Sequence, residues 1–391
     1  MPTPGLPLPP AMSSQAGGGN NKHRLTSHRA RRASKEIKSM FETTTASPTF
    51  RKRLGWFVLL LAVFLLGQNW GYKQAQPPRP PFAVDKLPPP PSPPTGYSIT
   101  PERKIPPIVH YVYGLSKDFG GKPFGFAQFV AMNSMLENIH PEKVMVWCKY
   151  EPQSWWWGKI KEYAAKKGVQ WEMKEARDVE EVFGNKVEHF AHKADIIRLE
   201  ALKQHGGIYL DSDVFIIKDF KPLYRYSTVM GMESQPDITQ ELPTGICNAI
   251  ILAQPYAPFI SRWLESYADF DRSLWATHSV ARPWELARQY PNEITVLDKK
   301  AFFWPVWHTE HMQLVHESLD YDFDKSGQLA YHAWESLAWG WLAQWDPDTI
   351  WIYGRKEAGE PGETSLTRLA RRWVPQELRN EWRTAKAAGL V

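Results

Sequence analysis

The sequence predicts an α/β fold in which helices cover both faces of a mainly parallel sheet. Short apolar segments typical of strands alternate with helical segments from about Ile105 onward. The 391 residues are 43% hydrophobic and 23% charged, which is sufficient for one large core or two modest ones. A pair of aspartates follows one of the apolar segments, where open α/β sheets bind their ligands.

The expected elements can be placed in order along the chain. Hydrophobic spacing predicts strands over 108–113, 143–148, 208–210 and 247–252, and helices over 126–138, 156–167, 192–205 and 256–270. Gly206 and Gly207 can end the third helix, because glycine tolerates the left-handed backbone of a helix C-terminus. No glycine-rich dinucleotide motif or P-loop occurs, so neither a Rossmann oxidoreductase nor a P-loop kinase is indicated.

The basic residues are concentrated at the N-terminus. The chain has 47 Lys and Arg against 42 Asp and Glu, but ten basic and only two acidic residues lie within 1–53. The remainder therefore carries 37 basic and 40 acidic residues, which argues against nucleic acid as a partner. Residues 1–53 are rich in Pro, Gly and Ser, and we expect a disordered basic tail on the cytosolic side.

An uncharged segment follows this tail. Residues 54–72 would span roughly 28 Å as a helix, close to the thickness of a thin bilayer. A buried core helix is the alternative, but the segment has no polar stripe before Gln68, and Trp56 and Trp70 lie near its ends. The excess of basic residues before it predicts a single-pass type II protein with a Pro-rich luminal stem over 73–104.

Two cysteines limit the possible sites. Cys148 and Cys247 exclude a disulfide scaffold and a zinc or iron–sulfur site built from cysteines, and whether they pair remains open. The run Trp155-Trp156-Trp157 could meet a sugar or a bilayer surface. The alternative for this run is a helix packed on the sheet.

Four charged residues form the strongest functional pattern. Asp211 and Asp213 stand at the end of the predicted strand 208–210, and carboxylates suit Mg²⁺ or Mn²⁺, ions that bridge nucleotide phosphates. The alternative is an exposed acidic turn. Asp195 and Arg198 share one helix face and can meet, the alternative being a surface ion pair. The planar fork of Arg198 suits phosphate oxygens or sugar hydroxyls.

The block from 192 to 213 resembles the sugar-nucleotide signature of glycosyltransferase family 32, which also occurs in the glucosyltransferase domains of large clostridial toxins. The resemblance implies a GT-A-type sandwich, a nucleotide-sugar donor, a divalent metal and retaining transfer. In the family, residues matching Asp195 and Arg198 contact the donor sugar, and the one matching Tyr209 lies at the nucleotide. The two aspartates hold the ribose and the metal.

Two further segments fit the same family. Residues 105–114 resemble its opening strand, which implies that Val112 and Tyr113 line the base pocket, while His110 is expected in the core. Residues 331–339 resemble its C-terminal His-x-Trp-x-Ser-x-x-Trp motif.

The C-terminal motif implies His332 as a third metal ligand and Trp334 and Trp339 as substrate-binding residues. Asn248 and Ala249 match family positions beside the donor sugar and acceptor. The predicted catalytic residues are Asp211, Asp213 and Arg198. No nucleophile can be named, although Glu233, Asp237 and Glu241 follow the aspartates.

These observations predict a metal-dependent retaining glycosyltransferase of the Golgi membrane, with a catalytic domain over 105–354 and a peripheral tail over 355–391. The metal is Mn²⁺ or Mg²⁺. Family precedent favours GDP-mannose as the donor, with a UDP-sugar possible, and a glycan or glycolipid as the acceptor. The alternatives are an inositol-phosphorylceramide mannosyltransferase and a non-catalytic glycan-binding membrane protein that kept the fold.

Overall fold

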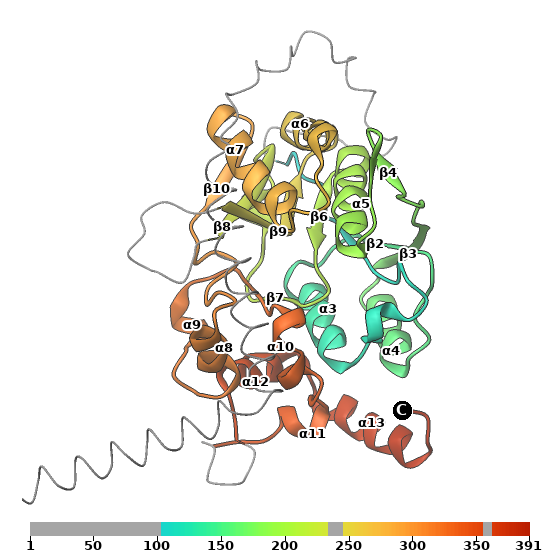
Figure 1. Cartoon of the computed structure of the whole chain (residues 1–391). Coiled ribbons are helices and arrows are strands. Elements are labelled where there is room, and N and C mark those ends of the chain that lie inside the picture. Colours follow the sequence, from blue (N-terminus) through green and yellow to red (C-terminus); the bar gives the residue numbers. More distant parts are fainter. Residues whose placement is uncertain (1–102, 234–244, 355–361) are drawn as a thin grey trace, which may run out of the picture. The chain divides into compact units, whose positions relative to one another are not determined.

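The computed structural model describes residues 103–233, 245–354 and 362–391 (Figure 1). A seven-stranded sheet with the order β10-β8-β9-β6-β1-β2-β3 lies at the centre. Its strands are β1 (Ile108–Val112), β2 (Lys143–Cys148), β3 (Gln170–Glu175), β6 (Gly207–Leu210), β8 (Thr228–Glu233), β9 (Gly245–Ala253) and β10 (Thr295–Leu297).

The sheet is mixed but mainly parallel. Strand β1 runs parallel to β2 and β6, β2 to β3, and β8 to β10, whereas β9 is antiparallel to both β6 and β8. Every residue of β9 is buried, as expected for a central strand with both faces covered. The predicted α/β class is therefore confirmed.

Helices cover the two faces of this sheet. The longer ones are α3 (Phe126–Asn138), α4 (Trp155–Lys166), α5 (Phe190–His205), α6 (Pro258–Glu265), α7 (Arg282–Gln289), α8 (Thr309–His316), α10 (Glu335–Leu342) and α13 (Gln376–Ala387). One buried apolar cluster includes residues of α3 and α4, and a second includes residues of α5, α6 and α7. The predicted helix 256–270 is in fact α6 followed by the 3₁₀ turn η4 (Ser266–Asp269).

The tryptophan run lies at the start of α4. Trp157 is buried, with its ring centre 4.9 Å from that of Phe124 and 5.5 Å from that of Trp171 on β3. Trp156 is buried against Phe126 and Phe129. These two indoles therefore belong to the core, in agreement with the packing alternative.

A glycine pair sets the junction between α5 and β6. Gly206 and Gly207 both have positive φ, of 63° and 107°. A Cβ on Gly207 would lie 2.4 Å from the carbonyl oxygen of Ile108, so only glycine lets β6 approach β1 here. The Nε2 atom of His110 lies 2.8 Å from the Gly206 oxygen, and burial lowers the pKa of His110 to about 3. His110 is thus a core residue, as predicted.

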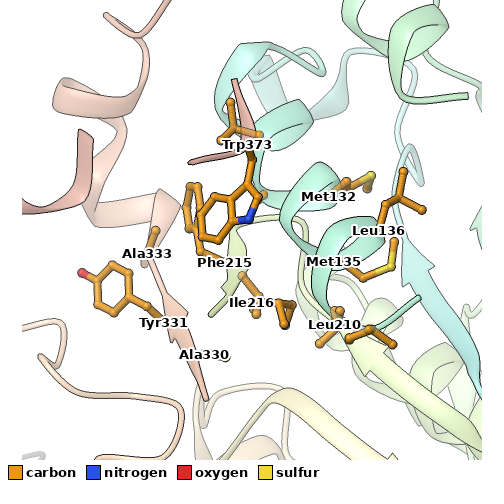
Figure 2. Close-up of a cluster of buried hydrophobic side chains, with 14 of the residues drawn as sticks. Met132, Met135, Leu136, Leu210, Phe215, Ile216, Ala330, Tyr331, Ala333 and Trp373 are labelled. Carbon is orange, nitrogen blue, oxygen red and sulfur yellow. The ribbon is translucent and has the colours of Figure 1, made fainter. Parts of the chain in front are cut away.

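A small second sheet adjoins the main one. Strands β7 (Val214–Ile216) and β11 (Ala330–His332) pair antiparallel, with His332 opposite Val214. Figure 2 shows the apolar cluster around them, in which Phe215 of β7 lies beside Trp373, and Met132, Met135 and Leu136 extend from α3. This packing holds the β7–β11 strand pair in place.

The C-terminal segment was predicted to be peripheral, and for its described part, 362–391, that prediction is wrong. Leu366, Leu369 and Trp373, on α12 (Ser365–Ala370) and η6 (Arg371–Trp373), are buried in the main core. The Nδ2 atom of Asn133 donates a hydrogen bond of 2.8 Å to the Trp373 oxygen. The high charge of the segment belongs to the outer faces of its helices, whose inner faces are apolar.

Other predictions about chain organisation fall on different residues. No helix in the part of the chain that the structure describes is long and apolar enough to cross a membrane. The predicted spanning segment 54–72, the tail 1–53 and all but the last two residues of the stem lie outside the described residues. Cys148 and Cys247 are both buried and free.

Candidate active site

The two aspartates lie where the sequence places them, in the turn between β6 and β7. The backbone nitrogen of Asp211 donates to the oxygen of Ala249 on β9 at 2.9 Å, and this bond fixes the start of the turn. The hydroxyl of Tyr209 donates to Oδ1 of Asp211 at 2.6 Å. Asp213 is buried, whereas Asp211 is about a quarter exposed.

The pairing of β7 with β11 brings His332 to Asp213. The Nε2 atom of His332 lies 3.3 Å from Oδ2 of Asp213. Burial opposes the charged form of each group, but their mutual attraction outweighs it, lowering the pKa of Asp213 and raising that of His332. Ligand atoms of Asp211, Asp213 and His332 all lie within 4.8 Å of one another.

These three side chains fit a divalent cation. Two carboxylates and one imidazole are a donor set for Mn²⁺ or Mg²⁺, and the Nδ1 atom of His332 is buried without a hydrogen-bond partner among the described residues. The predicted ligands are therefore together in space, although 119 positions separate Asp213 from His332 in the sequence.

A buried polar cluster joins α5 to this turn. The guanidinium of Arg198 lies 3.2 Å from Oδ1 of Asp195 and 3.4 Å from Oδ1 of Asp211, and it donates to the Asn248 oxygen at 2.8 Å. Its centre is 4.4 Å from the ring centre of Tyr209. Asp195 and Arg198 are 6% and 5% exposed, which excludes a surface ion pair.

The cluster is held together by opposite charge and hydrogen bonds. Burial raises the pKa of Asp195, and the charge of Arg198 and a 2.7 Å hydrogen bond from Nδ2 of Asn248 only partly offset this rise. Burial works against the charged form of Arg198, but Tyr209, Asp211 and Asp195 outweigh it and raise the pKa of the guanidinium. Arg198 is therefore a fixed positive charge beside the two aspartates.

The residues predicted to line the pocket for the nucleotide base, Val112 and Tyr113, lie at the end of β1. The hydroxyl of Tyr113 donates to the Lys122 oxygen at 3.0 Å, and the Tyr113 ring stacks on that of Phe119 with centres 5.9 Å apart. Val112 is half-buried against the second apolar cluster. Beyond these residues, a cavity of about 270 Å³ opens at the carboxyl ends of β1, β2 and β3.

Polar and charged side chains line most of this cavity. They include Lys149, Asp178 and Lys193, with Leu115 and Phe190 supplying apolar surface. The Lys149 amine pairs with the Asp178 carboxylate. Neither Val112 nor Tyr113 lines the cavity, although β1 leads directly to it.

The two tryptophans of the C-terminal motif differ in their surroundings. The Trp334 ring centre lies 4.1 Å from that of His332, and the residue has a left-handed backbone with φ 54°. Its Nε1 atom is buried without a partner among the described residues. Trp339 is half-buried, and the Nζ atom of Lys122 lies 5.3 Å from the centre of its ring.

The structure adds three residues that sequence reasoning missed. The backbone nitrogen of Glu335 donates to Oδ2 of Asp213 at 2.7 Å, and burial together with Asp213 raises the pKa of Glu335 to about 7. The amide of Gln128 on α3 donates to Oε1 of Glu335. Lys122, on the loop between β1 and α3, brings a positive charge to the same region.

Only Glu335 had a signal in the sequence, because it lies within the C-terminal motif. Of the three acidic residues noted after the aspartates, Glu233 is described and ends β8. Burial raises the pKa of Glu233, and its carboxylate accepts hydrogen bonds from Nε1 of Trp307 at 3.1 Å and from the thiol of Cys247. Asp237 and Glu241 lie outside the described residues.

The chain matches known glycosyltransferases. Residues 129–230 match the family described as "Glycosyltransferase sugar-binding region containing DXD motif". A protein of Cryptococcus neoformans var. grubii, "Glucan organizing enzyme 1", is 43% identical over 251 residues, which cover 63% of this chain and 67% of that protein. The chain belongs to this DXD glycosyltransferase family. The predicted resemblance is confirmed.

Several solved glycosyltransferase structures are similar to the chain. The bifunctional glycosyltransferase WbbM in its apo form has a TM-score of 0.42 at 9% identity, with 72% of this chain and 51% of that chain covered. Apo GlyE of Streptococcus pneumoniae TIGR4 has a TM-score of 0.38 at 10% identity, with 72% and 64% covered. PaToxG glycosyltransferase has a TM-score of 0.31 at 15% identity, with 47% and 69% covered.

Proposed function

We propose that this DXD glycosyltransferase transfers a hexose from a nucleoside diphosphate sugar to a glycan with the help of a divalent cation. The observation that carries the proposal is the buried group of Asp211, Asp213 and His332 beside the fixed guanidinium of Arg198. A divalent cation held by these three side chains, together with the positive charge of Arg198, would complement the negative charge of a sugar diphosphate.

Asp211, Asp213 and His332 would hold the cation, which would supply positive charge to stabilise the leaving diphosphate. Arg198 acts mainly through position, because Nε and both terminal nitrogens already face protein oxygens. It holds the carboxylates of Asp195 and Asp211 in a fixed orientation, from which they can accept hydrogen bonds from donor hydroxyls.

The N-terminal half of the sheet supplies the place for the nucleoside. The cavity at the ends of β1, β2 and β3 adjoins α5, the same helix that carries Asp195 and Arg198. Its lysines and carboxylates offer both donors and acceptors to a base or ribose. Trp334, Trp339, Asn248 and Ala249 remain the proposed neighbours of the transferred sugar and the diphosphate.

The finer assignments belong to this proposal. GDP-mannose is the favoured donor by family precedent, and the name of the Cryptococcus relative makes UDP-glucose the main competing donor. The proposal further includes transfer with retention of configuration and a glycan acceptor. It also includes a type II membrane anchor, with the active site in the Golgi lumen. The apolar segment 54–72 and the Pro-rich stretch after it support this membrane topology.

Donor hydrolysis by the purified full chain tests the proposal. GDP-mannose, UDP-glucose and other UDP- and GDP-sugars are incubated with Mn²⁺, and the released nucleoside diphosphate is measured. We expect turnover of one donor that chelation abolishes and that Asp213→Asn lowers at least about 100-fold, the magnitude typical of losing a main electrostatic group. Asp324→Asn is the matched control, since Asp324 is 71% exposed.

The remaining outcomes separate the alternatives. Donor binding measured by calorimetry without turnover, followed by transfer only when inositol-phosphorylceramide is added, would favour the inositol-phosphorylceramide mannosyltransferase. Absence of both nucleotide binding and Mn²⁺ binding in the folded protein would refute the proposed activity and favour a non-catalytic glycan-binding protein.

A further inference from the structure

A large exposed aromatic side chain packs against the start of α5, the helix that carries Asp195 and Arg198. Trp275 is 64% exposed and lies in the loop between η4 and the π-helical turn η5 (Thr277–Ala281). Covering an indole with a ligand buries a large apolar area, so an exposed tryptophan that neighbouring rings hold in position is a candidate binding residue.

The loop holds this indole in a defined place. The Nε2 atom of His192 lies 3.4 Å from the Trp275 carbonyl oxygen. The rings of His189 and His192 lie 5.6 and 5.3 Å from the Trp275 ring, between centres. Just before it, Oδ1 of Asp271 accepts hydrogen bonds from the backbone and hydroxyl of Ser273 at 2.9 and 2.7 Å. The indole is therefore supported by two imidazoles while much of its surface faces solvent.

Trp275 is connected to the donor site through α5. His192 precedes Asp195 by three residues on one helix face, which is a rise of roughly 4.5 Å. Behind it, the ring of Phe270 lies 5.2 Å from His192 and 5.7 Å from Tyr267, whose phenol is close enough to feel the charges of Asp195 and Arg198. Trp275 therefore packs on the same face of α5 that carries Asp195.

The surroundings of Trp275 favour a sugar over a protein or a bilayer. Leu274 is the exposed apolar neighbour, at 46%. Arg272 and Glu188 form an ion pair of 2.7 Å beside this short apolar stretch, and Ser273 adds a hydroxyl. One flat aromatic face with polar groups at its edge matches a pyranose, which presents C–H groups on one face and hydroxyls around its rim.

We propose that Trp275 is a stacking subsite for a sugar residue of the acceptor glycan, removed from the hydroxyl that receives the hexose. This inference rests on the proposed function. In this proposal Trp275 strengthens binding of the acceptor. It takes no part in donor binding or in the transfer step. Acceptors that are too short to reach the indole are consequently used without its help.

The test compares the full chain with its Trp275→Ala and Trp275→Phe variants. Binding of mannotriose and laminaritriose, and of methyl mannoside and methyl glucoside, is measured by calorimetry and by transfer kinetics. We expect Trp275→Ala to weaken binding of one trisaccharide, and to raise its KM, about tenfold, the effect of a stacking contact of roughly 1.4 kcal/mol. Trp275→Phe retains most of the affinity, and the methyl glycosides are unaffected.

Two controls make the result specific. Tyr353→Ala removes another aromatic ring that is 64% exposed, far along the chain from α5, and should leave saccharide affinity unchanged. Donor hydrolysis without acceptor should be equal in wild type and Trp275→Ala, so failure of the proposed function shows separately as loss of that hydrolysis in wild type. Equal trisaccharide affinity in wild type and Trp275→Ala, including no measurable affinity in both, would overturn the inference.

Discussion

The buried histidine His316 gives the protein a predictable weakness in mild acid. His316 is the last residue of α8 and is 6% exposed. Its ring stacks on that of Trp341, with ring centres 4.9 Å apart and planes 15° from parallel. Burial lowers the pKa of His316 to about 4, from an ordinary value of 6.5. Its Nε2 atom has no hydrogen-bond partner among the described residues, so a proton there would find no acceptor.

The size of the effect follows from the two pKa values. Between pH 6.5 and 4 the unfolded chain binds a proton at His316 that the folded chain does not, so stability falls as the pH falls. With folded and unfolded values of about 4 and 6.5, lowering the pH from 7.5 to 5.0 costs about 2 kcal/mol at this residue. Roughly four fifths of the loss occurs below pH 6.5.

Urea denaturation of wild type and His316→Phe at pH 7.5 and 5.0 measures this cost. Phenylalanine keeps a flat ring against Trp341 but cannot take a proton. We expect the free energy of unfolding of the variant to fall by about 2 kcal/mol less than that of wild type between the two pH values. Equal falls in both proteins would show that His316 ionises freely in the folded state, which would refute the reasoning.

Three further substitutions test other parts of the structure. Lys122→Met removes a positive charge near Trp339 and Glu335 and should raise the KM for the donor roughly tenfold in steady-state kinetics. Lys122→Arg keeps the charge and should have a KM close to that of wild type. An unchanged KM in Lys122→Met would count against a role for this amine. Trp373→Ala leaves a cavity in the core next to Phe215 of β7 and should lower the free energy of unfolding, measured in urea, by about 3–5 kcal/mol. A loss below about 1 kcal/mol would indicate that the C-terminal segment is peripheral after all. Gly207→Ala should lower the free energy of unfolding by at least about 2 kcal/mol, because the added Cβ would meet the backbone of β1. Gly340→Ala on α10, which has open space around it, is the control and should leave the melting temperature unchanged or raise it. Similar melting temperatures for the two variants would contradict the close approach of β6 to β1.

The parts of the fold that the sequence predicts are those with a local signature. Strand β2 occurs over the predicted residues, because Val144 to Cys148 form an apolar run between Lys143 and Lys149. Strand β3, at the sheet edge, was not predicted: its polar and apolar residues alternate only from Gln170 to Lys174, and this short strand signal was missed. Its conformation depends on pairing with β2, which is a tertiary contact.

The site divides in the same way. Asp195 and Arg198 are three residues apart on a helix, so their contact could be derived from helix geometry alone. Assigning His332 to the aspartates needed the family resemblance, because nothing local connects β11 with the turn after β6. Lys122 and Gln128 had no signal, as they reach the site only when the loop after β1 and helix α3 are in place.

The pairing of β7 with β11 also determines when the candidate active site can exist. Asp213 and Glu335, whose backbone nitrogen donates to its carboxylate, are 122 residues apart, and His332 lies close to the far end of that interval. During synthesis on the ribosome, the turn with both aspartates emerges well before the strand that completes the ligand group. The nascent chain therefore exposes two carboxylates without their imidazole, and the complete cation site forms only after most of the domain has been made.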